Sequence, residues 1–335
     1  MSMAAQWWFW PALAVGLLLF SRIFMVRITW RAAVQSLRPA RKVPDRLTDL
    51  RVDNPAAVTW LGHATALVQL GDAFILTDPV LKDRIGAVQR RLVEPGVDPA
   101  HLPPIDLTVI SHAHLDHLDL PSLRAVPGHG IIVAPHGVAR HLPRELPFAQ
   151  IVELKVGESY THRGVTVTVT GAKHWGGRAG VDGLWDRACG GFYFAAEAGT
   201  VFYAGDTGYD AELFAQIGRV QPPDIALIPL GPSRPRWVMR MNHLGAADAL
   251  RVFDDLRAGH FVAVHHSTFI HSTDPPHEPR HEFLALAAGR PDAARIHVPF
   301  YGEQLLFARE GERLTLAGRR GPNAATVDAA FGRWR

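Results

Sequence analysis

The sequence predicts an α/β fold in which short strands alternate with helices. Apolar runs of strand length recur along the chain and are separated by turn residues such as Gly62 and Gly71-Asp72. Among and after these runs, Ala246–Leu256 and Glu278–Ala288 are expected to be helical. No linker-like stretch follows Pro55, so one α/β domain is favoured over two.

The expected strands are short and bounded by turn residues. Val165–Thr170 alternates strictly between Val and Thr, which is typical of a strand with one buried face. The polar, Gly- and Arg-rich residues 311–335 predict a tail after a domain that spans residues 56–310. The complete set of expected strands is Val58–Trp60, Ala66–Leu70, Phe74–Thr77, Ile105–Ile110, Ile131–Ala134, Ile151–Leu154, Val165–Thr170, Phe192–Ala195, Val201–Tyr203, Ile225–Ile228 and Phe261–Val264.

Composition narrows the classes of function. The 335 residues are 47% hydrophobic and 20% charged, which is enough for a sizeable core and argues against disorder. The net charge is only +3 and no long basic arm is evident, so no nucleic-acid partner is expected. The 18 histidines raise the expectation of metal chemistry. The single cysteine, Cys189, excludes an internal disulfide and fits a small buried apolar side chain.

The N-terminus predicts a membrane anchor over residues 1–30. Residues 7–26 are nearly all apolar, interrupted only by Ser21 and Arg22, and a spanning helix needs about 20 such residues. Tryptophans lie at both ends of this stretch, as expected at membrane interfaces. A cleaved signal peptide fits less well, because no basic residue precedes Trp7 and no Ala-x-Ala follows Phe20. A helix lying in the interface is a further alternative.

A basic linker is expected over residues 31–55. Arginine and lysine outnumber the two acidic residues Asp45 and Asp49 before Arg51. By the positive-inside rule, this excess leaves the rest of the chain in the cytoplasm, at the inner membrane. The same charges would attract anionic lipid at the inner leaflet.

The histidine-rich stretch Ser111–His117 carries the chemistry. It follows the apolar run Ile105–Ile110 and holds His112, His114, Asp116 and His117 within six residues. Side chains two apart point the same way in an extended segment, so the first two histidines can converge on one ion. If a helix then begins, the aspartate and the last histidine are directed toward a second ion. This mixture of nitrogen and carboxylate ligands suits zinc, and also iron or manganese.

This run resembles the His-x-His-x-Asp-His signature of the metallo-β-lactamase superfamily. The resemblance implies a four-layer αββα sandwich with metal ions at the edge of two facing sheets. It also implies three later ligands, each after a strand, and His174, Asp206 and His265 occupy those places. Only one of the adjacent residues His265 and His266 is expected to face the metal ions. The place of His265 in the family pattern favours His265.

The resemblance implies two divalent ions, with zinc favoured over iron or manganese. His112, His114 and His174 are assigned to one ion; Asp116, His117 and His265 are assigned to the other; Asp206 is assigned to both. Ions about 3.5–4 Å apart would clamp the attacking and leaving oxygens and lower the pKa of a bridging water to about 7. Asp116 and Asp206 are therefore predicted to act in catalysis.

Further motifs are similar to the branch of N-acyl-phosphatidylethanolamine-hydrolysing phospholipase D. The similarity runs from about Val58 to Pro279 and departs at His266-Ser267, where that family usually has Trp-Gly. It implies a phosphodiesterase acting on a glycerophospholipid. The motifs are Thr59–Thr65, Leu76–Pro79, His174-Trp175, Gly205–Tyr209, Pro235–Trp237 and His265–Phe269.

Five more residues receive supporting roles. His243 matches a histidine that this family places beside the substrate, and it is predicted to take part in catalysis and substrate binding. Arg178 and Arg236 are candidates to bind the substrate phosphate, because the guanidinium fork matches it. Asp78 and His63 are candidates to orient the metal ligands from behind.

Two other functions stay open. One is a soluble-substrate hydrolase of the same fold, such as a lactonase or another phosphodiesterase; a true β-lactamase fits less well. The other is a non-catalytic metal-bound membrane scaffold, which the complete ligand set disfavours. The oligomeric state cannot be predicted from the sequence.

Overall fold

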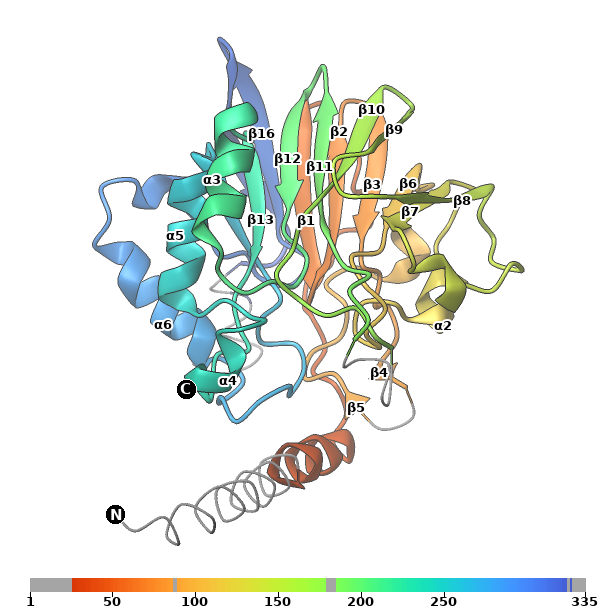
Figure 1. Ribbon diagram of the computed structural model, residues 1–335, viewed down its shortest axis with the longest axis vertical. Coiled ribbons are helices and arrows are strands. Elements are labelled where there is room, and N and C mark those ends of the chain that lie inside the picture. The colour runs from red at the N-terminus through yellow and green to blue at the C-terminus, as the bar shows by residue number, and fades with distance from the viewer. Residues whose placement is uncertain (1–25, 87–88, 179–184, 324–325, 327–335) are drawn as a thin grey trace, which may run out of the picture.

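Two β-sheets packed face to face, with helices on their outer sides, form the body of the protein in the computed structural model (Figure 1). The structure describes residues 26–323, apart from residues 87–88 and 179–184, together with residue 326. The α3, α5 and α6 helices lie on one outer side, and α2 lies on the other (Figure 1). The predicted αββα sandwich is confirmed.

The strands divide between two large sheets. In spatial order, the eight-stranded sheet contains β17 (Arg313–Arg320), β16 (Gln304–Glu310), β1 (Ala56–Gly62), β2 (Thr65–Leu70), β3 (Ala73–Thr77), β6 (Leu107–Val109), β7 (Ile131–Pro135) and β8 (Gln150–Leu154). The seven-stranded sheet contains β15 (Ile296–His297), β14 (His260–Val264), β13 (Ile225–Pro229), β12 (Gly199–Tyr203), β11 (Gly191–Ala196), β10 (Val165–Thr170) and β9 (Ser159–His162). A small hairpin pairs β4 (Arg84–Ile85) with β5 (Gln89–Arg90).

The main core lies between the two sheets. Val165, Val167 and Val169 of β10 are buried there, while the intervening threonines are only partly buried. This is the pattern that the Val/Thr alternation predicted. Phe192 and Phe194 of β11 point into the same core from the next strand. Alternation along the strands therefore fixes which face of each sheet is inward.

Helices cover the outer face of the seven-stranded sheet. These are α3 (Ala211–Val220), α5 (Ala246–Leu256) and α6 (Glu278–Ala288), whose apolar residues form a second core with that sheet. Two further helices are short. In the sequence, α2 (Leu120–Leu123) follows the histidine-rich stretch Ser111–His117, and α4 (Arg236–Met239) precedes His243. The two predicted helices have the expected bounds, whereas α3 had not been predicted.

The prediction of a polar tail is wrong for residues 313–320. These residues form β17, which pairs antiparallel with β16 at the edge of the sheet. Leu314 is 3% exposed and belongs to the core between the sheets. The arginines of this segment favoured a prediction of a polar tail over a strand, because an edge strand can carry many charges on its open side.

The expected linker is also packed against the domain. Residues 26–36 are helical, and Arg31 donates hydrogen bonds to the carbonyl oxygens of Ser272 (3.2 Å) and Asp274 (3.0 Å). Farther along, Val43 and Leu50 are buried. The domain therefore begins well before residue 56.

The predicted membrane anchor cannot be placed in the fold. Residues 1–25, which hold almost all of it, lie outside the described part of the chain. Within the described part, no helix is both long and apolar enough to cross a membrane.

Leu314→Ala tests whether β17 is part of the folded core. Truncating a buried leucine should lower the free energy of unfolding by about 2–5 kcal/mol. A neighbouring exposed change, Arg313→Ala, should have little effect. Urea denaturation of both variants measures the difference, and an unchanged midpoint for Leu314→Ala would show that residues 313–320 are a tail after all.

Candidate metal centre

All seven predicted metal ligands lie just past the ends of strands. The His112–His117 segment follows β6, and His174 follows β10. Asp206 follows β12 and His265 follows β14. These strands belong to two facing sheets, so their ends bring side chains from distant parts of the sequence to one edge. The rigid sheets then hold those side chains in place.

His112, His114 and His174 form one group. The Nε2 atom of His112 lies 2.8 Å from Nδ1 of His114, and Nε2 of His174 lies 3.3 Å from that same atom. The three nitrogens are close enough to share one ion. This is the set that was assigned to the first metal.

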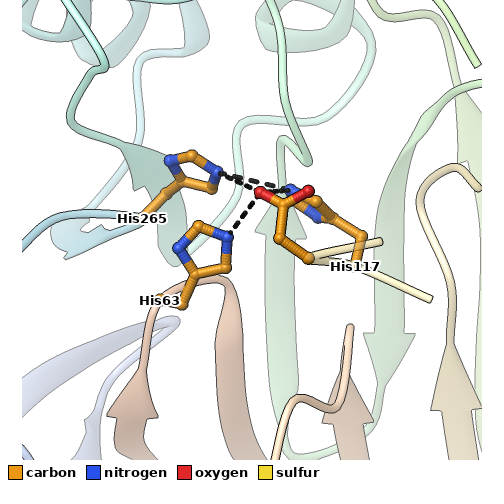
Figure 2. A group of neighbouring side chains, drawn as sticks. His63, His117 and His265 are labelled. Atoms are coloured by element: carbon orange, nitrogen blue, oxygen red, sulfur yellow. Dashed lines mark hydrogen bonds and ion pairs between the residues drawn. The ribbon is translucent and has the colours of Figure 1, made fainter. Parts of the chain in front are cut away.

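Asp116, His117 and His265 form a second group, and His63 joins them (Figure 2). The Oδ2 atom of Asp116 lies 3.0 Å from Nε2 of His63, 3.6 Å from Nε2 of His117 and 3.9 Å from Nε2 of His265. His117 and His265 bring their Nε2 atoms to 3.3 Å from each other. His63, which was expected to orient the ligands from behind, therefore lies among them.

Asp206 lies between the two groups. Its Oδ2 atom is 3.3 Å from Nε2 of His117 and 4.0 Å from Nε2 of His174. Its Oδ1 atom is 3.1 Å from Nε2 of His265 but accepts no hydrogen bond among the described residues. A buried carboxylate in contact with both groups has the position that a bridging ligand requires.

The far ring nitrogens of four histidines are held by neighbouring groups. Such contacts fix the ring orientation and leave the other nitrogen for a metal ion. The pairs are His112 Nδ1 with Ser111 Oγ (2.9 Å), His117 Nδ1 with Asp78 Oδ2 (2.7 Å), His174 Nδ1 with the Asn242 carbonyl (3.0 Å) and His265 Nδ1 with the Gly231 carbonyl (3.1 Å). The residues present therefore fit a pair of metal ions.

Asp78 is the centre of a buried hydrogen-bond network. Besides His117, it accepts hydrogen bonds from the Ser111 backbone N–H (2.7 Å), the Ser111 hydroxyl (2.6 Å) and the Tyr203 hydroxyl (2.5 Å). The side chain of Asp78 is fully buried. The structure thus places Asp78 directly behind a candidate ligand, as the sequence predicted.

Electrostatics in the site favour bound cations. Burial lowers the pKa of His112 and His174 well below the ordinary value, which keeps both rings in the neutral form that binds metals. Burial acts the same way on His117, but the carboxylates of Asp206, Asp116 and Asp78 outweigh it and raise the pKa of that ring. This local excess of carboxylates is a charge that divalent ions would balance.

Backbone strain is concentrated at the same place. His63, Asp78, His265 and Ser267 have φ angles of 54°, 32°, 57° and 56°. A non-glycine residue in such a region costs on the order of 1–3 kcal/mol, and such residues persist where the surrounding structure holds them. The contacts among the site loops supply that constraint here.

The structure also brings His243 to the site. Its Nδ1 atom lies 3.6 Å from Oδ2 of Asp206, and its side chain is 18% exposed, so a substrate could reach it. Arg236 supports this residue from behind, since it donates a hydrogen bond to the His243 carbonyl (3.0 Å) and pairs with Asp248. The predicted phosphate contact of Arg236 stays a prediction.

Arg178 braces the histidine-rich loop. One of its terminal nitrogens donates to the carbonyl oxygens of Ala113 (3.2 Å) and Leu118 (2.9 Å). These bonds show a role in shaping the loop that the sequence did not indicate. Whether Arg178 also contacts a substrate phosphate stays a prediction.

Two neighbours of the site were not anticipated. His271 places Nε2 3.7 Å from Oδ2 of Asp116, and its ring stacks on that of His63. Tyr203 reaches Asp78 from β12.

His266, the alternative to His265 as a metal ligand, stacks on Trp60 with ring centroids 4.3 Å apart. The structure therefore brings His265 into the cluster and turns His266 away.

Comparisons with known proteins agree with this geometry. Residues 74–266 match the family described as a Beta-lactamase superfamily domain. An uncharacterized protein of Mycobacterium tuberculosis is 33% identical over 293 residues, which cover 83% of this chain and 77% of that protein. The N-acyl-phosphatidylethanolamine-hydrolyzing phospholipase D 1 of Caenorhabditis elegans is 31% identical over 261 residues, 73% of each chain. The crystal structure of isothiocyanate hydrolase from Delia radicum gut bacteria has a TM-score of 0.61 at 25% identity, and the match covers 76% of this chain and 100% of that one.

Asp78→Asn tests the support behind the ligands. The amide cannot accept the His117 Nδ1 proton as strongly as the carboxylate does, so affinity for zinc should fall about 10–100-fold. Asp72→Asn, at an exposed position, is the matched control. Competition with a zinc-binding dye measures both, and equal affinities would contradict the role given to Asp78.

Proposed function

The chain belongs to the metallo-β-lactamase superfamily, as a metal-dependent hydrolase, and on that premise we propose that it cleaves a phosphodiester bond in N-acyl-phosphatidylethanolamine-like glycerophospholipids. The observation that carries this proposal is Asp206, a buried carboxylate between two groups of imidazoles. The similarity to the phospholipase D of Caenorhabditis elegans supports the choice of substrate. Cleavage of phospholipase D type breaks the phosphorus–oxygen bond on the headgroup side.

Bound divalent ions would supply Lewis acidity and lower the pKa of a coordinated water to about 7. The side chains around the proposed ions would fix the charge and the ring positions. Asp206 and Asp116 keep negative charge fixed on either side of His117, and Asp78 holds the His117 Nδ1 proton. In the proposed step a water oxygen would form a new bond to phosphorus as the bond to the headgroup oxygen breaks, and the proton that the water gives up would pass to the departing oxygen, which leaves as an alcohol.

His243 is proposed to contact the substrate during this step. Burial lowers the pKa of this histidine to about 4, so the ring is neutral at physiological pH. A neutral imidazole has one N–H donor and one acceptor. Nδ1 lies 3.6 Å from the Asp206 carboxylate, beyond hydrogen-bond distance, so in the proposed step the single N–H of the ring is on Nε2 and donates to a phosphoryl oxygen. The Arg236 contact to the His243 carbonyl sets the position of this residue.

The location proposed for the enzyme is the cytoplasmic face of the inner membrane. Its support is the apolar segment over residues 7–26 and the excess of arginine that follows it. A membrane location would place the catalytic domain next to a lipid substrate.

Asp206→Asn should lower the metal content of the purified protein and abolish turnover. The amide removes the negative charge that both candidate metal positions share. Elemental analysis gives the metal-to-protein ratio, and hydrolysis of bis-nitrophenyl phosphate gives the rate. Near-normal metal content together with near-normal kinetics would refute the bridging role.

A side-by-side assay tests the substrate class. The metal-loaded protein is offered an N-acyl-phosphatidylethanolamine, bis-nitrophenyl phosphate and a lactone. We expect cleavage of both phosphodiesters, with the lipid preferred, and release of an N-acylethanolamine. Cleavage of the lactone alone would replace the phosphodiesterase by a lactonase of the same fold.

A further inference from the structure

An arginine lies fully buried behind the loops of the metal centre. Arg91, which directly follows β5, is 0% exposed. Its Nη1 atom donates a hydrogen bond to the Val80 carbonyl (3.1 Å), whereas Nε and Nη2 have no hydrogen-bond partner among the described residues. Arginine is almost never fully buried unless its charge is paired, so this position calls for a physical reason.

The charge of Arg91 is not balanced by a close carboxylate. Burial lowers the pKa of the guanidinium to about 10, which still leaves it protonated at neutral pH. Asp83 and Glu94 attract it from a distance, and Glu94 itself pairs with Arg46. An unpaired buried charge lowers the stability of the folded state. Proteins tolerate such a feature mainly where it serves a functional site.

The Val80 carbonyl belongs to the strained turn at Asp78. Asp78 has a φ angle of 32°, and the Thr65 hydroxyl spans this turn, since it donates to the Asp78 carbonyl (2.8 Å) and accepts from the Val80 N–H (3.0 Å). The hydrogen bond from Arg91 fixes the Val80 carbonyl as well. Because Asp78 Oδ2 lies 2.7 Å from Nδ1 of His117, this turn sets the orientation of that imidazole.

The same guanidinium packs against two more loops of the site. A Cβ atom at Gly62 would lie 2.8 Å from Nη2 of Arg91, so the arginine fills the space beside the residue that precedes His63. On another side, Cζ of Arg91 lies 5.7 Å from the centroid of the Phe269 ring, within the range of a cation–π attraction. The Phe269 ring meets His63 edge-on, with centroids 5.2 Å apart.

The backbone at this position joins the same loops. The Arg91 N–H donates to the Asp83 carbonyl (2.9 Å), and the next N–H, that of Leu92, donates to the Thr268 carbonyl (2.8 Å). The Thr268 hydroxyl accepts a hydrogen bond from the His63 N–H (2.7 Å). Main chain and side chain together therefore connect loops from three separate parts of the sequence.

We propose that Arg91 is a positioning residue for the second metal position. That position is the group formed by His63, Asp116, His117 and His265 (Figure 2). Arg91 holds the His63 loop by packing and the His117 ring through the Asp78 turn. The first position depends less on these contacts, because its ligands follow β6 and β10. This inference rests on the metal centre and is independent of the phosphodiesterase proposed above.

The test compares Arg91→Met with Arg90→Met in the full chain. Methionine keeps an unbranched stem and removes the guanidinium. Arg90 is the matched control, since this neighbouring arginine donates to the Arg38 carbonyl (3.2 Å) and not to a loop of the site. Competition with a zinc-binding dye measures the affinities for two zinc ions. We expect Arg91→Met to bind one ion about tenfold more weakly, the low end for groups behind metal ligands, and the other ion unchanged. Arg90→Met should keep both affinities of the parent protein.

Two single-position backgrounds identify the ion that is affected. His114→Ala removes a ligand of the first position, and His117→Ala removes a ligand of the second. Adding Arg91→Met should weaken zinc binding in the His114→Ala background and leave it unchanged in the His117→Ala background. Equal affinities of Arg91→Met and the parent protein, or equal weakening in both backgrounds, would overturn the proposal.

Thermal unfolding of the metal-free proteins separates positioning from a purely structural role. Removing the guanidinium takes an unpaired charge and two unpartnered nitrogens out of the core and loses one hydrogen bond. The unfolding temperature of Arg91→Met should therefore not fall below that of the parent protein. A lower temperature together with equal loss of both ions would show that Arg91 only stabilises the fold.

A second variant covers the case in which Arg91→Met does not fold. Arg91→Lys keeps the charge but lacks the planar fork, so it should show the same selective loss of the second ion. Parent affinities in Arg91→Lys would overturn the proposal. A parent protein that binds no zinc would instead refute the metal centre itself. None of these measurements uses hydrolysis, so failure of the proposed phosphodiesterase is distinguished from failure of this role.

Discussion

The structure depends on balancing the negative charge of three carboxylates at the edge of the sandwich. Asp78 is fully buried, Asp206 is 3% exposed, and Asp116 is mostly buried. Removing a carboxylate from water costs several kcal/mol unless it is paired and hydrogen-bonded. Several imidazoles contact Asp116 and Asp206, and one contacts Asp78, but burial lowers the pKa of His112, His174 and His63 and keeps those rings neutral. A neutral ring can accept a metal ion and cannot by itself balance three charges.

This constraint explains why the ligands come from so many strands. No single loop could pack three carboxylates and their imidazole neighbours together, since each needs its own hydrogen-bond partners. The sandwich solves the problem by ending β6, β10, β12 and β14 at one edge. The strained residues His63 and His265 then sit opposite each other, with ring centroids 4.0 Å apart. Strain of this kind is tolerated because the sheets fix the loops on both sides.

Much of the site could be predicted because its signal is local. Four candidate ligands fall within the His112–His117 segment, and the others follow strands that periodicity reveals. Contacts between distant residues left no such signal. Nothing in the local sequence indicates that Tyr203 bonds to Asp78, or that His271 turns back to Asp116.

Charged residues in two stretches predict a tail and a linker, yet both stretches are packed against the domain. In residues 313–320, Leu314 is buried in the core, Arg313 is exposed, and Arg319 pairs with the buried carboxylate of Glu303 at 3.0 Å. In the N-terminal segment, Arg31 bonds to carbonyl oxygens more than 200 residues away in the chain. Those carbonyls belong to Ser272 and Asp274, in the segment that also carries His265 and His271. The N-terminal helix is therefore physically connected to the loop that borders the metal centre.

The most direct measurement is anomalous X-ray diffraction from crystals of the metal-loaded protein at the zinc absorption edge. The charge balance described here predicts two peaks, one beside His112, His114 and His174 and the other beside Asp116, His117 and His265. Both should lie within coordination distance of Asp206. A fully loaded crystal with no peak among these side chains, or with a peak that leaves Asp206 uncoordinated, would contradict the account.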